Sequence, residues 1–200
     1  MNKEKIKRLF TSFGIGAACA LWVLVLLTEP PGMLMMLLCA VLVHEMGHCA
    51  AMLLSGIRPL GLHMLPFGML IEAELIKVGY IREWFIYMSG PFAGLLSAAL
   101  VLALFRGGEL ATTYILLSAG LGLFNLLPLP GLDGAGALRA LLSFLCPSPT
   151  SPYIICRAVQ GVFCFCFFAV CLAVWVRHGT AAYPLLLSVF FLVRFAGERF

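Results

Sequence analysis

Three ionisable side chains lie close together within an apolar stretch of the chain. His44, Glu45 and His48 form an H-E-x-x-H pattern inside the run 37–54, whose other residues are apolar or small. An ionisable residue in the middle of a membrane helix costs about 2.5–3.5 kcal/mol on insertion scales. Three such residues together therefore indicate a functional or pairing role.

The spacing of the two histidines favours metal binding. Residues i and i+4 share one face of a helix, so the imidazoles of His44 and His48 can reach the same ion. Zinc with nitrogen and oxygen ligands and one open position lowers the pKa of its bound water to about 7. Glu45, next to the metal, could then take the proton as water attacks a carbonyl. The alternative is a polar cluster that packs helices without a metal.

Two histidines leave zinc one ligand short, and Asp133 is the single aspartate of the chain. Pro128 and Pro130 precede it and break helical hydrogen bonding, while Gly131 and Gly134 permit turns. Such non-helical backbone could direct the carboxylate of Asp133 toward a metal inside a protein-lined cavity. The alternative is an aspartate in a loop at the membrane surface.

The elements that position these residues must be membrane helices. The chain has 200 residues, of which 62% are hydrophobic and 11% charged, with a mean hydropathy of +1.06. This composition excludes a water-soluble domain. We expect an all-α polytopic membrane protein with about six transmembrane helices. The expected spans are 9–28, 33–55, 84–105, 111–127, 153–176 and 181–195.

The distribution of basic residues predicts the orientation. Two basic residues, Arg106 and Arg177, fall in the loops of one side, and the other 11 of the 13 fall on the opposite side. Both termini are therefore expected in the cytoplasm. The second and fourth spans then run in the same direction, which brings His48 and Asp133 toward the same side. The basic residues on the cytoplasmic side are Lys3, Lys5, Lys7, Arg8, Arg58, Lys77, Arg82, Arg139, Arg157, Arg194 and Arg199.

The connections between spans carry less information. Residues 71–75 alternate between apolar and acidic or small residues after the turn-like stretch 66–68, which is compatible with a small membrane-associated β-hairpin between the second and third spans or with an ordinary loop. The connection 128–152 is rich in Pro, Gly and Ser. Most of the eight cysteines lie in apolar runs without metal-finger spacing, so we interpret them as packing residues.

The two motifs together resemble those of the site-2 protease family of intramembrane zinc metalloproteases. The similarity consists of H-E-x-x-H in one helix and, about eighty residues later, N-x-x-P-x-x-x-x-D-G at 125–134. Within this family the chain looks most like the sporulation-type branch, which processes membrane-tethered precursors of sigma factors. The chain departs from the common pattern at Gly131, where members often carry proline, and at Ala135, where a second glycine is usual.

The resemblance implies an enzyme, a zinc metalloendopeptidase, with one Zn²⁺ per chain. His44, His48 and Asp133 would bind the metal, Glu45 would be the general base, and Asn125 would hold the substrate backbone or the developing oxyanion. Ser89-Gly90-Pro91 and Gly94 are similar to a small-residue motif of the family core, and the two glycines would allow close helix approach.

The same resemblance sets expectations for domains, partners and location. We expect a single transmembrane metalloprotease domain over 1–200 with a core at about 33–140, and no PDZ or CBS domain. The substrate would be a membrane-embedded or membrane-tethered protein, with regulated intramembrane proteolysis as the process. The lipid bilayer and an unknown regulatory membrane protein are the other expected partners, and nucleic acid is not one. A bacterial cell membrane is the expected location.

Two competing functions stay open at this stage. One is an H-E-x-x-H membrane protease of another architecture, whose third ligand is a downstream glutamate. The other is a non-catalytic membrane scaffold or transporter component with structural zinc. The intact Glu45 beside both histidines argues against the second, because a structural site needs no base.

Overall fold

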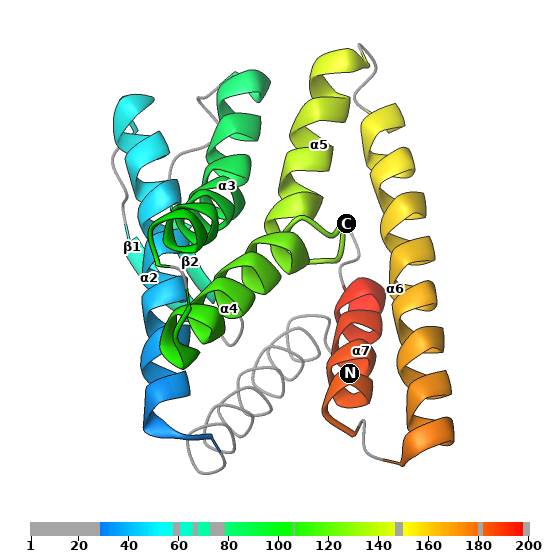
Figure 1. The fold of residues 1–200 in the computed structure, drawn as a ribbon. Coiled ribbons are helices and arrows are strands. Elements are labelled where there is room, and N and C mark those ends of the chain that lie inside the picture. Colours follow the sequence, from blue (N-terminus) through cyan, green and yellow to red (C-terminus); the bar gives the residue numbers. More distant parts are fainter. Residues whose placement is uncertain are drawn as a thin grey trace.

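The computed structural model describes residues 29–57, 61–65, 68–72, 79–105, 107–146, 150–179 and 182–197. The expected first span at 9–28 and the basic residues before it lie outside the described residues. The described elements, in chain order, are α2 (Pro31–Leu54), β1 (Gly61–Leu65), β2 (Gly68–Glu72), α3 (Tyr80–Leu104), α4 (Glu109–Asn125), α5 (Asp133–Leu145), α6 (Thr150–His178) and α7 (Ala182–Gly197) (Figure 1).

Three of these helices are long and apolar enough to cross a bilayer, which marks the chain as a membrane protein. They are α2, α3 and the stretch Ser151–His178 of α6. α4 has 17 residues and α7 has 16, fewer than the roughly 20 that a span requires. Gly107 and Gly108, both with φ above 110°, stop α4 from beginning earlier, and Pro128 follows its end.

The predicted fold class is therefore wrong as stated. Five of the six expected spans fall within the described part of the chain, which has three candidate spans. The other two, expected at 111–127 and 181–195, form helices at nearly the expected positions, but α4 and α7 are shorter than a full span. The two strands pair antiparallel with each other, from Gly61 opposite Glu72 to Leu65 opposite Gly68, and with no third strand among the described residues. The expected association of this strand pair with a membrane is not seen.

The connection 128–152 also contains a helix that the sequence did not predict. α5 covers 13 residues and buries a narrow face of small side chains against its neighbours. Its apolar and polar residues separate onto two faces more clearly than those of the other described helices, but the surrounding Pro, Gly and Ser residues favoured a loop at the sequence level. The buried residues of α5 are Gly134, Ala135, Ala137 and Ala140.

α3 is central to the group of helices that carries the motif residues. It packs against α2, α4 and α5, while α6 packs against α7 and α5 (Figure 1). Small residues allow this close packing: a Cβ on Gly47 of α2 would lie 2.5 Å from the carbonyl oxygen of Ser89 in α3. A Cβ on Gly94 would lie 3.3 Å from the carbonyl oxygen of Ser118 in α4. The predicted close helix approach at the glycines of α3 is confirmed.

A buried cluster fixes the loop between α4 and α5. Leu129 and Leu132 of this loop pack with Cys164 of α6 and Phe191 of α7. Pro130 is fully buried as well. Three of the seven described cysteines are buried in α6, which agrees with their interpretation as packing residues. The loop that leads into Asp133 is therefore held on both sides by the core.

Candidate metal centre

His44 and His48 face the same direction from adjacent turns of α2. Both side chains are buried, and their Nε2 atoms lie 3.3 Å apart. The rings meet edge to face, with centroids 5.0 Å apart. This is the arrangement that the i, i+4 spacing predicts. Gly90 of α3 makes room for it, because a Cβ there would lie 2.2 Å from Nε2 of His48.

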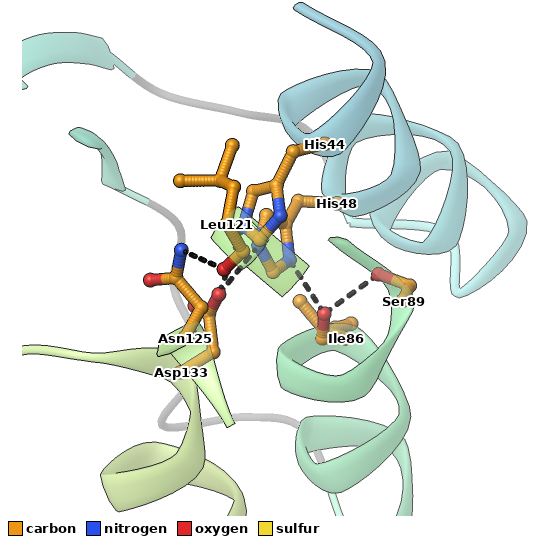
Figure 2. A network of polar contacts seen from close by, with 7 residues as sticks. All are labelled: His44, His48, Ile86, Ser89, Leu121, Asn125 and Asp133. Carbon is orange, nitrogen blue, oxygen red and sulfur yellow. Dashed lines mark hydrogen bonds and ion pairs between the residues drawn. The ribbon is translucent and has the colours of Figure 1, made fainter. Parts of the chain in front are cut away.

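Asp133 joins the two histidines from a different part of the chain. Its Oδ2 lies 3.0 Å from Nε2 of His44 and 3.2 Å from Nε2 of His48 (Figure 2). Asp133 is the first residue of α5, directly after the buried loop. The following residue must be glycine in this fold, because a Cβ on Gly134 would lie 2.1 Å from the carbonyl oxygen of Leu126.

The three donor atoms have the spacing of ligands around one tetrahedral ion. They form a triangle with edges of 3.0, 3.2 and 3.3 Å. Zinc bonds of about 2.0–2.1 Å at tetrahedral angles place ligand atoms roughly 3.3–3.4 Å apart. Two imidazole nitrogens and one carboxylate oxygen, with a fourth position open, are the ligand types of catalytic zinc sites. The residues fit a bound metal ion of this kind.

The hydrogen bonding of His48 adds a second reason to expect a cation. Its Nδ1 lies 2.7 Å from the backbone carbonyl oxygen of Ile86, which can only accept a hydrogen bond. Nδ1 therefore carries the hydrogen, and in a neutral ring Nε2 presents a lone pair. That lone pair faces Oδ2 of Asp133, another acceptor. Two acceptors at this distance require a proton or a metal ion between them.

The carboxylate of Asp133 is well suited to bind a cation. Burial alone would raise its pKa, but the contacts with His44 and His48, whose rings donate hydrogen bonds and carry positive charge when protonated, hold the pKa of Asp133 below its ordinary value. The group is therefore an anion at neutral pH. Its side chain is 18% exposed.

The two predicted catalytic residues lie on different helices, one of which carries donors. Glu45, between the histidines in α2, is buried. Asn125 is the last residue of α4, and its Nδ2 donates to the carbonyl oxygen of Leu121 at 3.0 Å (Figure 2). An amide nitrogen has two hydrogens, so this contact uses one of the two donors. The roles of Glu45 and Asn125 stay predictions.

The downstream glutamates do not replace Asp133 within the described part. Glu83 pairs with Arg139, and Glu109 is exposed. The side chain of Glu72, together with Glu74 and Glu198, lies outside the described residues. The group of possible metal ligands found among the described residues consists of His44, His48 and Asp133.

Sequence reasoning missed the groups that support the metal-binding residues. The carbonyl of Ile86 orients His48, and the hydroxyl of Ser89 donates to the same carbonyl oxygen at 2.7 Å. Every residue has a backbone carbonyl, so the sequence does not show which one accepts the hydrogen bond from His48. The ion pair of Glu83 and Arg139 was also missed, although a glutamate within an apolar helix is a usable signal.

The fold and the site together define a helical membrane protein with a candidate metal centre between α2 and α5. The chain matches no family model and no curated protein sequence. Among solved structures it is similar to a site-2 protease from Methanocaldococcus jannaschii, with a TM-score of 0.60 and 22% sequence identity. The similarity covers 97% of this chain and 88% of that one. The chain thus shares the fold of a site-2 protease.

Proposed function

We propose that this protein is an intramembrane zinc metalloprotease that hydrolyses a peptide bond in or next to a membrane-embedded or membrane-tethered segment. The observation that carries the proposal is the convergence of His44, His48 and Asp133 at 3.0–3.3 Å, from two helices that are far apart in sequence. The shared fold with a solved site-2 protease supports it. A purely structural site would not require a glutamate between the two histidines.

Each of the three residues would supply one ligand atom to the ion. His44 and His48 would each supply Nε2, and Asp133 would supply Oδ2 with its negative charge. The Ile86 carbonyl keeps the His48 ring in the tautomer that leaves Nε2 free for a metal. When bound, zinc would act as a Lewis acid toward a carbonyl and lower the pKa of water beside it.

Glu45 would act first as the general base and then as the general acid. Its carboxylate accepts a proton from water as that water attacks the substrate carbonyl carbon, and then delivers the proton to the leaving amide nitrogen. Burial in α2 keeps bulk water from competing for this proton. Asn125 would hold the substrate backbone or the developing oxyanion with the Nδ2 hydrogen that does not bond to Leu121.

The finer assignments are parts of the same proposal. The substrate would be a membrane-tethered regulatory protein, as in the sporulation-type branch whose motifs this chain resembles, and the location would be a bacterial cell membrane with both termini cytoplasmic. The single catalytic domain with its core at 33–140 likewise stays a prediction. Zinc is proposed over other divalent ions because a helical H-E-x-x-H pattern, with a glutamate beside two histidine ligands, is the pattern of zinc metalloproteases.

A cleavage assay in liposomes tests the function. The full-length protein is reconstituted with a panel of single-span peptides that carry a fluorophore and a quencher on opposite sides of the span. We expect the wild type to cleave at least one peptide and to lose activity with a zinc chelator, while adding zinc back restores it. A wild type that holds one zinc per chain but cleaves no peptide would favour the non-catalytic scaffold.

A further inference from the structure

α3 carries a buried carboxylate that the metal centre does not use. Glu83 lies in the first turn of α3, and its side chain is only 12% exposed. Its Oε1 accepts a hydrogen bond of 2.9 Å from a terminal guanidinium nitrogen (Nη2) of Arg139 in α5. A buried carboxylate is costly unless a cation pairs with it. The Arg139 side chain is 57% exposed, so the pair lies at the edge of the α3–α5 contact.

The pair joins the two elements that set the geometry of the site. On α3, Glu83 lies three residues before Ile86, whose carbonyl orients His48. On α5, Arg139 lies six residues after Asp133. At 1.5 Å per residue these separations are about 4.5 Å and 9 Å along the helix axes. The ion pair therefore links α3, whose Ile86 carbonyl orients His48, to α5, which carries Asp133.

A second contact between α3 and α5 involves Tyr87. The ring of Tyr87 lies directly on Gly136, where a Cβ would come within 2.4 Å of the ring. The same tyrosine hydroxyl lies 3.5 Å from Nη2 of Arg139. Gly136 thus sets how closely the two helices approach, and the contacts of Arg139 set their position along each other.

We propose that the Glu83–Arg139 ion pair is a positioning clamp, which keeps Asp133 within ligand distance of His44 and His48. The inference rests on the proposed metal centre. Neither residue of the clamp touches the metal ligands. Their effect is transmitted through α5, because a shift of this helix along α3 moves Asp133 by the same amount while the histidines stay on α2.

Cobalt binding to the detergent-purified full-length protein tests the clamp. Co²⁺ replaces zinc in such sites and gives visible absorption bands that report the number and geometry of its ligands. In the double variant Glu83→Gln/Arg139→Gln, which removes both charges and keeps polar side chains at both positions, we expect cobalt affinity to fall by about 10- to 100-fold. The bands should also change as the Asp133 oxygen leaves its position.

Two further variants make the result specific. Arg139→Lys keeps the charge and should restore part of the affinity that the double variant loses. Arg82→Gln removes a charge from the exposed neighbour of Glu83 and should leave both affinity and spectrum as in the wild type. If the double variant fails to fold without metal, as judged by its melting curve, Arg139→Lys alone carries the test, and its expected loss is smaller but measurable.

The outcomes separate the clamp from the metal centre. Wild-type cobalt affinity and an unchanged spectrum in the folded double variant, or in Arg139→Lys where that variant carries the test, would overturn the clamp and leave the metal centre standing. A wild type that binds no cobalt would overturn the metal centre and the clamp with it. A weaker and spectrally altered site in the double variant, with partial rescue in Arg139→Lys, supports the clamp.

Discussion

His48 is hydrogen-bonded through Nδ1 to the carbonyl oxygen of Ile86 at 2.7 Å, so its Nε2 faces the carboxylate of Asp133 as an acceptor. This hydrogen bond between His48 and Ile86 holds the ring in the orientation that the proposed metal site requires. It also makes α3, which contributes none of the three candidate ligands, part of the candidate metal centre. By contrast, Nδ1 of His44 is buried without a hydrogen-bond partner among the described residues. His48 is the better oriented of the two histidines.

Metal content should follow the three convergent residues. We expect about one zinc per chain in the wild type and less than about a tenth of that in His44→Ala or Asp133→Asn, because each change removes one of three ligands. Elemental analysis of the purified protein measures this. His178→Ala changes an exposed histidine at the end of α6 and is the matched control. Full zinc retention in Asp133→Asn would mean that another residue is the third ligand.

Glu45 should be needed for hydrolysis but not for metal binding. In Glu45→Gln the side chain keeps its size and loses its ability to accept a proton, so we expect normal zinc content and cleavage reduced by about 100-fold or more. The liposome assay and metal analysis of the same preparation measure both quantities. Wild-type cleavage rates in Glu45→Gln would remove this residue from the proposed mechanism.

Gly90 should be intolerant of any side chain. The Cβ of Gly90→Ala would overlap the His48 ring, so this ring must tilt away from Asp133 and zinc affinity should fall by at least about 10-fold. Gly120→Ala is a matched control, since Gly120 lies inside α4 and a Cβ there meets no atom within 4 Å. Titration against a zinc chelator of known affinity compares the two. Equal zinc affinities in both variants would show that the His48 ring does not need the space at Gly90.

Acid should release the metal by protonating imidazoles. The lowered pKa of Asp133 means that its carboxylate stays ionised from neutral pH down past its ordinary titration range. Histidine side chains ordinarily titrate near pH 6.5, and a protonated ring cannot bind a metal. We therefore expect zinc affinity to fall as the pH drops, by nearly 100-fold per pH unit once two protons compete. Release only at a pH below the ordinary range of aspartate, with a slope of one proton, would instead assign it to Asp133.

The local sequence was enough to identify the candidate ligands. It did not predict the number of membrane spans correctly. The H-E-x-x-H spacing places two rings on one helix face whatever surrounds it, and the lone aspartate after two prolines was a natural third ligand. The span number failed because the apolar stretches at 111–127 and 181–195 form helices of only 17 and 16 residues, shorter than a full span. α5 was missed because the Pro, Gly and Ser content of 128–152 is typical of a loop, although the apolar residues of α5 follow a helical period.

What the sequence determined by itself is the chemistry: an apolar chain with two histidines, a glutamate and an aspartate, whose types and spacing fit zinc and proton transfer. What the tertiary structure decided is the geometry among distant residues. The Ile86 carbonyl, the space at Gly90 and the ion pair between Glu83 and Arg139 all depend on how α3 packs against α2 and α5. Such contacts join residues 38 to 56 positions apart in the chain. Periodicity and spacing report only neighbours along one helix, so these contacts could not be derived from them.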